Sequence, residues 1–179
     1  MISWLRRLVA RLGGTGDVPP DFPGALEPDE HVLAVARTSE GALVATHLGL
    51  WLAEGRRVGW HLISKATWQG GVLTVVEAEE TGTAGGAVLL RDRPGVRLPL
   101  TEPGRLPDVV HERVTRSIRS RHHRELPGGG AWFVQRRVPG RDGIVLQVRP
   151  DRGTDEQVVA EFAATVVEKL RQARGTDRG

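Results

Sequence analysis

Arginine is the residue type whose number and spacing in this sequence point most clearly to chemistry. Between Arg105 and Arg141 there are nine arginines against three carboxylates, a local net charge of +6 in a chain whose net charge is +3. Guanidinium groups bind phosphate and carboxylate oxygens through paired hydrogen bonds, so this segment predicts a surface for an anionic partner. The residues predicted to form it are Arg113, Arg116 and Arg119, spaced along one side of a helix, and Arg136 and Arg137 on a hairpin.

A composition bias is the competing interpretation of this segment. Only two of the 25 basic residues are lysines, so arginine is abundant everywhere in the chain. The same residues are then a solvated helix face without a partner.

Sequence patterns for catalysis and metal binding are absent. The chain lacks a glycine-rich phosphate loop, a G-x-S-x-G elbow and an H-E-x-x-H pair, and it has no cysteine. His31, His47 and His61 fall on separate predicted strands, and the adjacent His122 and His123 point in different directions. We therefore predict no catalytic residues, no metal site and no cofactor. An enzyme without a recognisable motif stays open as an alternative.

Three tryptophans recur at regular intervals along the first half of the chain. Trp51, Trp60 and Trp68 are nine and eight residues apart, about one per predicted strand. On adjacent strands they would line a pocket wall, although filling the core is the favoured interpretation.

The elements that position these residues begin with short runs rich in Val, Leu and Trp. Gly, Pro or charged residues separate the runs, which predicts an antiparallel meander that forms a small barrel or a bent sheet. The predicted strands are 31–37, 42–47, 49–54, 57–63, 71–78, 86–91 and 95–100.

Two helices and a hairpin are predicted after this meander. A helix over 107–122 carries a narrow apolar seam, and runs at 131–138 and 144–149 form a hairpin. The last helix, 155–172, begins with a capping box of Thr154 and Gln157, and its broad apolar stripe predicts a buried Phe162.

The first twelve residues divide into an apolar and a basic side when placed on a helix. The linker 13–30, rich in Gly and Pro, follows them. This segment is not a secretory signal, and it predicts an amphipathic helix that anchors the protein on an anionic membrane or docks on another surface. Packing of the helix on its own domain is the alternative. The apolar side consists of Ile2, Trp4, Leu5, Leu8, Val9 and Leu12, and the basic residues are Arg6, Arg7 and Arg11.

Residues 31–120 resemble the bacterial pleckstrin-homology-like and GRAM-like domains. This resemblance implies a seven-stranded barrel closed by an amphipathic helix, and it leaves open whether 107–122 or 155–172 is that helix. The matching positions are Pro28, Asp29 and Glu30 before the first strand, Thr46, Leu48 and Leu50 in the next pair, and Ile63 and Ala66 after the fourth.

The predicted fold class is therefore α+β: an antiparallel PH-like barrel or bent sheet closed by amphipathic helices, with an N-terminal amphipathic helix. A single domain is expected over 31–174, followed by a disordered tail at 175–179. The predicted function is a non-catalytic binding module for an anionic membrane surface or a protein partner. The predicted location is cytoplasmic, peripheral on the inner membrane face. Nucleic-acid binding through 105–141 is the alternative, and the sequence does not indicate an oligomeric state.

Overall fold

The structure, a computed structural model, describes residues 17–176. The predicted N-terminal helix over residues 2–12, with its apolar and basic sides, lies outside the described residues, as do residues 177–179. Among residues 17–176, no helix combines the length and the apolar character that crossing a membrane requires.

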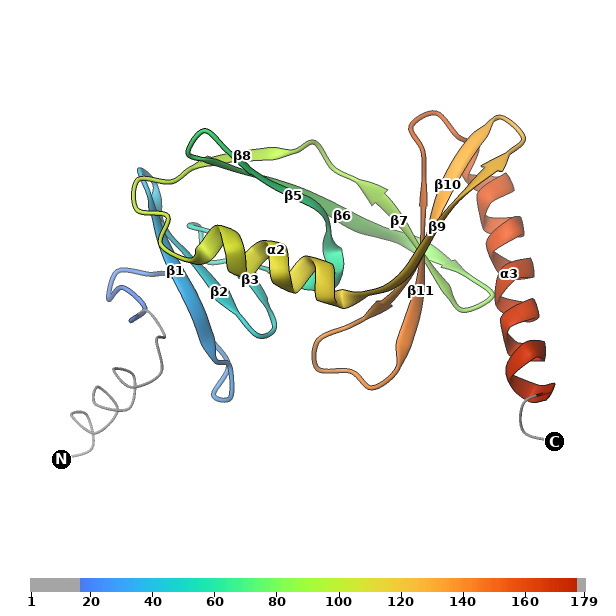
Figure 1. Cartoon of the computed structure of the whole chain (residues 1–179), viewed down its shortest axis with the longest axis horizontal. Helices are drawn as coiled ribbons and strands as arrows, with labels where there is room; N and C mark the ends of the chain where they lie inside the picture. Colours follow the sequence, from blue (N-terminus) through green and yellow to red (C-terminus); the bar gives the residue numbers. More distant parts are fainter. Residues whose placement is uncertain (1–16, 177–179) are drawn as a thin grey trace. The chain divides into compact units, whose positions relative to one another are not determined.

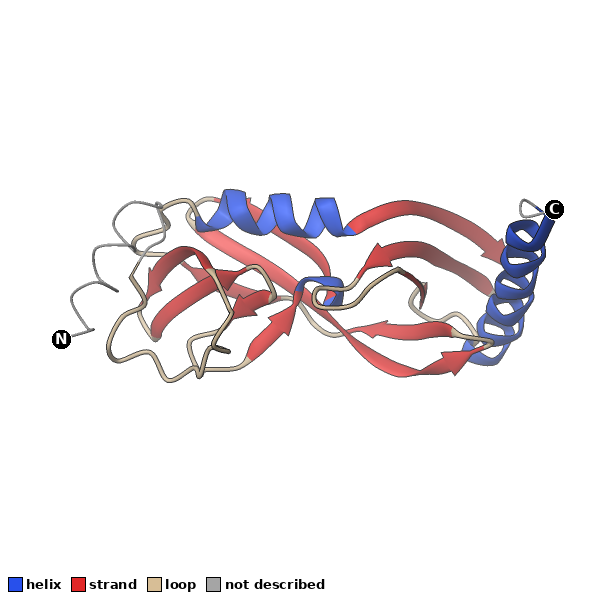
Figure 2. Cartoon of the chain, turned by 90° about the horizontal axis from the view of Figure 1, so that it is seen from below, coloured by secondary structure: helices blue, strands red, loops and turns tan. Residues whose placement is uncertain are grey.

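The predicted α+β class is wrong, because the described part of the chain is mostly β. Strands make up 47% of it and helices 22%, and α2 and α3 are its two α-helices. Figure 2 shows how strongly the strands predominate. A curled half-barrel stands where a barrel closed by helices was expected, and the strands are not purely antiparallel, because β7 and β11 run parallel.

The sequence predicted a single domain over residues 31–174. In the structure, the described chain divides into two compact units. Unit 1 contains residues up to Glu77 and the segment Pro94–Arg116. Unit 2 contains Ala78–Arg93 and the chain from Ser117 onward. Strand β6, Val72–Ala84, runs through the first boundary, so one long strand contributes to both units.

Unit 1 contains one four-stranded antiparallel sheet and a second group of three strands. In the first sheet the strands follow chain order, and a 3-10 turn, Trp60–Leu62, leads on to the second group. There β5 and β8 pair with opposite sides of β6. The bounds are β1 Val32–Thr38, β2 Gly41–Thr46, β3 Gly49–Trp51, β4 Arg57–Gly59, β5 Ile63–Gln69 and β8 Val96–Pro99.

Helix α2, Leu106–Ser117, follows the strands of unit 1 in the chain (Figure 1). It contributes one apolar stripe to the core of this unit. Leu106, Val110 and Val114 recur every four residues, so they lie on one side of the helix. All three are buried in one cluster with side chains from the strands, among them the fully buried Leu43 and Leu50. The sequence left open whether 107–122 or 155–172 closes the barrel. The helix that covers this core is α2, which corresponds to the first of these two segments.

Unit 2 is a sheet covered on one face by the C-terminal helix. The second half of β6 pairs with β7, and the order continues through β11 and β10 to β9 at the edge. The bounds are β7 Ala87–Asp92, β9 Ile118–Leu126, β10 Gly129–Arg137, β11 Ile144–Pro150 and α3 Glu156–Thr176.

Helix α3 buries small residues against this sheet and leaves its one large aromatic partly exposed. Val159 and Ala163 are fully buried with Phe133 and Val148 of the strands. Phe162 contacts the Phe133 ring edge-on at 5.5 Å between centroids, yet remains 37% exposed. The prediction that Phe162 is buried was wrong, because it lies at the margin of the stripe that faces the sheet.

The N-terminus of α3 is capped by a residue other than the one predicted. Asp155 accepts hydrogen bonds from the backbone N–H groups of Gln157, at 2.8 Å, and Val158, at 3.4 Å. Thr154 is buried and bonds instead to both backbone groups of Gly130 on β10. The threonine therefore fastens the helix start to the sheet, while the aspartate caps the helix.

Helix α2 ends five residues before the predicted end at residue 122, and the chain continues directly into strand β9. The apolar four-residue period stops at Ile118, so a longer helix would have no further side to bury. As a strand, residues 118–126 instead pair with β10 over its whole length. Leu126 pairs with Gly129, so the two strands form a tight hairpin around Pro127 and Gly128, a turn signal that the helix prediction did not use.

Candidate functional site

The predicted arginine ridge does not form as a helix side. Arg113 and Arg116 lie on α2 in unit 1, whereas Arg119 lies on β9 in unit 2. Arg116 is paired with Glu112 at 2.7 Å, one helical turn away, and Arg113 is half-buried.

Strand geometry separates the other two predicted residues, Arg136 and Arg137, although they are neighbours in the sequence. Successive side chains of β10 point to opposite faces of the sheet. Arg136 is only 3% exposed, and Arg137 is exposed. Burial, together with the nearby charge of Arg149, lowers the pKa of Arg136 to about 10. Arg136 is thus not available to a partner, and the prediction that it belongs to a binding surface is not supported by its position.

Four exposed arginines lie on the edge strand of the sheet in unit 2 and at the end of its neighbour, and we call them the basic edge: Arg119, Arg121, Arg124 and Arg137. By the alternation of the strand, Arg121 and Arg124 belong to opposite faces of the sheet at this edge. Strand β9 is the last in the order and carries three of them. Arg137 ends β10, where its neighbour Arg136 pairs with Ile118 at the start of β9.

None of the basic-edge arginines has an ion pair with a carboxylate among residues 17–176. Seven other described arginines do have one, so the lack of a carboxylate partner is not general to the chain, although exposed arginines on other elements, such as Arg97, Arg105 and Arg174, share it. The paired arginines are Arg37, Arg56, Arg57, Arg91, Arg93, Arg116 and Arg149.

One tryptophan lies beside the basic edge, and its ring is already in contact with charged and aromatic side chains. The Arg121 guanidinium carbon lies 5.6 Å from the centroid of the Trp132 ring, and the His123 ring meets it edge-on at 5.1 Å. His123 Nε2 is in turn 2.7 Å from an Asp151 carboxylate oxygen. These contacts hold Arg121 in place through its aromatic partner.

Unit 1 holds a buried carboxylate whose partners identify it as structural. The side chain of Glu30 accepts hydrogen bonds from Thr46 Oγ1 at 2.5 Å, Trp51 Nε1 at 2.8 Å and the Glu27 backbone N–H at 3.1 Å. It also pairs with Arg57 at 2.8 Å and is itself fully buried. Burial raises the pKa of Glu30, but these donors and the Arg57 charge outweigh that effect and lower it below its usual value. The network joins the segment before β1 to β2, β3 and β4.

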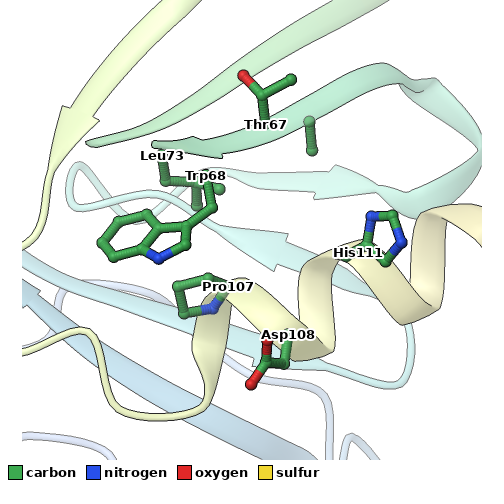
Figure 3. A pocket seen from close by; sticks show the side chains of 7 residues that line it. Thr67, Trp68, Leu73, Pro107, Asp108 and His111 are labelled. Carbon is green, nitrogen blue, oxygen red and sulfur yellow. The ribbon is translucent and has the colours of Figure 1, made fainter. Parts of the chain in front are cut away.

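The three regularly spaced tryptophans have different roles. Trp60 is a core residue at 2% exposure, and Trp51 belongs to the Glu30 network. Trp68 is 42% exposed and lines a hollow in unit 1 between β5 and the first turns of α2 (Figure 3). The pocket wall of three tryptophans that we considered does not form, and one of them lines a hollow alone.

The described residues contain no group of three or more His, Asp or Glu side chains placed to hold a metal ion. His31 and His47 contact each other, with 5.1 Å between ring centroids, and His47 Nδ1 accepts the His31 backbone N–H. These histidines connect backbone segments.

No family model, curated protein or solved structure matches this chain. The resemblance to PH-like domains therefore stays a prediction, and the function has to be inferred from the surfaces themselves.

The sequence analysis included Arg121 and Arg124 in the charged segment but not among the site residues, because the predicted ridge followed the helical spacing of Arg113, Arg116 and Arg119. Read as an edge strand, that segment places both on the surface. The isolation of Trp68 from the other tryptophans has no signal in the sequence, because it depends on which strand ends next to α2.

Proposed function

We propose that this chain is a non-catalytic binding module that docks on an anionic membrane surface through the basic edge. The observation that carries the proposal is that four exposed arginines, Arg119, Arg121, Arg124 and Arg137, lie along one sheet edge without carboxylate partners among residues 17–176. Guanidinium groups left unpaired in this way are available to lipid phosphates.

The amphipathic segment of residues 2–12 is the second contact in this proposal. A single short amphipathic helix binds membranes weakly, and two weak contacts on one chain bind much more tightly than either alone. The proposed location follows from it: peripheral, on the cytoplasmic face, where anionic lipids attract basic surfaces.

Lipid phosphate is favoured over nucleic acid by the state of the aromatic ring beside the basic edge. Proteins that bind single strands stack bases on accessible aromatic rings. The ring of Trp132 is already covered by Arg121 and contacted by His123. Base stacking would have to displace these contacts, whereas a phosphate group needs only the guanidinium groups.

Protection against aggregation is a competing role for the basic edge. Natural sheets often carry charges on an exposed edge strand, because charge discourages pairing with another chain. The two roles predict different results when the charges are removed, so one experiment separates them.

The experiment is co-sedimentation of the full chain with phosphatidylcholine vesicles with and without about 30% phosphatidylglycerol. The test variant changes Arg119, Arg124 and Arg137 to Gln and keeps Arg121, which contacts Trp132. Each arginine near an anionic surface contributes about 1 kcal/mol, so the triple change should weaken binding to anionic vesicles roughly a hundredfold.

The matched control removes the same charge from exposed arginines on other elements. Arg97, Arg105 and Arg174 are exposed and have no ion pair in the described structure, and changing them to Gln should have a much smaller effect. Equal losses in the two variants would show that only net charge matters and would contradict the proposal. Unchanged vesicle binding with new aggregation of the test variant would assign the edge to protection instead. Binding of single-stranded DNA is measured on the same proteins. If the test variant loses DNA binding but keeps vesicle binding, a nucleic-acid partner is favoured over a membrane.

A further inference from the structure

The hollow beside Trp68 in unit 1 has the features of a binding site and is separate from the basic edge. It has a volume of about 520 Å³ and is open to solvent on one side. Figure 3 shows the indole of Trp68 and the ring of Pro107 close together in the lining of the hollow, with Leu73 behind the indole. The remaining lining residues are Ala66, Thr67, Asp108 and His111.

The strand that borders the hollow has an unpaired side. Within the described structure β5 pairs only with β6, so its other side is open. Its backbone N–H and C=O groups there resemble those of any edge strand that accepts a further strand.

The hairpin that ends β5 shows which backbone groups face outward. Gly70 and Gly71 both have positive φ, as a two-residue hairpin turn of the I′ type requires. The flanking pair, Gln69 and Val72, is then hydrogen-bonded across the hairpin, and bonded and non-bonded pairs alternate from there. Trp68 is therefore in a non-bonded pair, and its N–H and C=O point away from β6.

The same alternation repeats two residues earlier. Thr67 pairs with Thr74 in a bonded position, and Ala66 pairs with Val75 in a non-bonded one. The outward backbone groups thus belong to Ala66 and Trp68, the two residues of β5 whose side chains face α2. Open hydrogen-bonding groups and an apolar hollow occur at the same residues.

The charge at the hollow indicates the kind of peptide that fits. Asp108 is the one acidic residue that lines the hollow, and it has no ion pair among residues 17–176. A basic side chain would pair with it. In an extended segment, residues two apart point to the same side, so an apolar side chain against Trp68 and a basic side chain near Asp108 suit positions i and i+2.

We propose that the hollow between β5 and α2 binds an extended segment of a partner protein that adds as a strand to β5. The segment places an apolar side chain against Trp68 and Pro107 and a basic side chain toward Asp108. Its backbone bonds to Ala66 and Trp68.

Fluorescence anisotropy of a labelled peptide, acetyl-Thr-Leu-Thr-Arg-Thr-Leu-Thr-amide, tests this proposal on the full chain. Trp68→Ala should weaken binding about tenfold, because an exposed aromatic anchor commonly dominates such a contact. Asp108→Asn should weaken it about threefold, and replacing the peptide arginine by glutamate should have a similar or larger effect. The controls are Val96→Ala, an exposed apolar residue on β8, and Glu112→Gln, one turn along α2; neither should change the affinity.

Amide hydrogen exchange gives a second readout that a merely sticky surface would not produce. Peptide binding should slow exchange at Ala66 and Trp68 and leave Thr67 and Gln69 unchanged, because those two already bond to β6. Uniform slowing along β5, or no binding of the peptide at about 1 mM, would overturn the proposal.

Two other occupants give distinct results. If a form of the chain that starts at Asp17 binds the peptide much more tightly than the full chain, the chain's own N-terminal segment occupies the hollow. If binding falls as protein concentration rises and dimers appear, a second copy occupies it. Either result would overturn the assignment to a partner protein.

Discussion

Glu30→Gln should destabilise the chain far more than its position at the start of the fold suggests. The carboxylate of Glu30 is fully buried and holds Thr46 and Trp51 through one oxygen, and Glu27 N–H and Arg57 through the other. A glutamine keeps one oxygen acceptor but places an NH2 group against the other two donors. It also removes the charge that partners Arg57.

The magnitude follows from these losses. Removing one partner of a buried ion pair lowers the free energy of unfolding by about 3 to 5 kcal/mol. Each hydrogen bond to a charged group contributes about 1.5 to 3 kcal/mol. Arg57 is 28% exposed by its side chain, so water compensates part of its loss. We therefore expect Glu30→Gln to lower the free energy of unfolding by about 3 kcal/mol.

Urea denaturation followed by tryptophan fluorescence measures this change, because Trp51 lies in the network. Glu27→Gln is the matched control: its carboxylate pairs with the same Arg57 at 2.7 Å but is 58% exposed. Such an exposed pair contributes about 1 kcal/mol or less. Equal costs for the two variants would refute the reasoning.

The pH dependence provides an independent check. The folded-state pKa of Glu30 lies below its unfolded value of 4.5. Its contribution is therefore complete above the unfolded pKa and is lost as the pH falls through the folded pKa. The stability difference between the original chain and Glu30→Gln should shrink as the pH is lowered from about 5 to about 3. A difference that stays constant over this range would mean that the charge of Glu30 does not stabilise the fold.

Two further predictions concern the C-terminal helix and are checked by thermal or urea denaturation. Val159→Ala, which removes fully buried atoms, should cost about 2 kcal/mol, whereas Phe162→Ala should cost only about 1 kcal/mol because the ring is 37% exposed; a larger cost for Phe162 would show that α3 packs differently. Asp155→Ala should cost about 1 kcal/mol through loss of the helix cap. Thr154→Ala should cost about 1 to 2 kcal/mol, because it removes the acceptor of the buried Gly130 N–H, while the Gly130 carbonyl keeps its bond from the Asp151 N–H. The control Thr165→Ala, on the exposed side of α3, should change stability little, and a similar loss there would contradict both assignments.

Local pattern determined most of the elements of this protein. The runs of Val, Leu and Trp predicted strands that the structure contains in each of the seven segments of 31–100, although 57–63 is a strand only over Arg57–Gly59 before a 3-10 turn. Strand β5, Ile63–Gln69, was not predicted. The later hairpin and the last helix lie close to their predicted bounds. Alternation and helical periodicity are short-range properties that depend on which side of an element is buried, so a sequence alone carries them. The four-residue seam of Leu106, Val110 and Val114 likewise identified the buried side of α2.

Tertiary structure alone decided that β7 pairs with β11, whereas a local hairpin decided the partner of β9. Residues 118–122 have the charge pattern of a helix end, yet they pair with β10, and β7 pairs in parallel with the distant β11. Only the second pairing joins segments far apart in the chain, so no local signal specifies it. Strands β9 and β10 form a hairpin around Pro127 and Gly128, a turn signal that the helix prediction did not use. Because residues 118–126 form a strand and not a helix, the arginines of this segment lie on the basic edge and not on a helical ridge.

The candidate surfaces show the same division. The sequence identified the arginine-rich segment by its charge, but the pleat of β10 decided that Arg137 is exposed while Arg136 is buried. It also showed regularly spaced tryptophans, but only the packing of β5 beside α2 left Trp68 at a hollow while Trp60 entered the core. Residue type determines what chemistry a side chain can perform, and burial, which depends on distant parts of the chain, determines whether a partner can reach it.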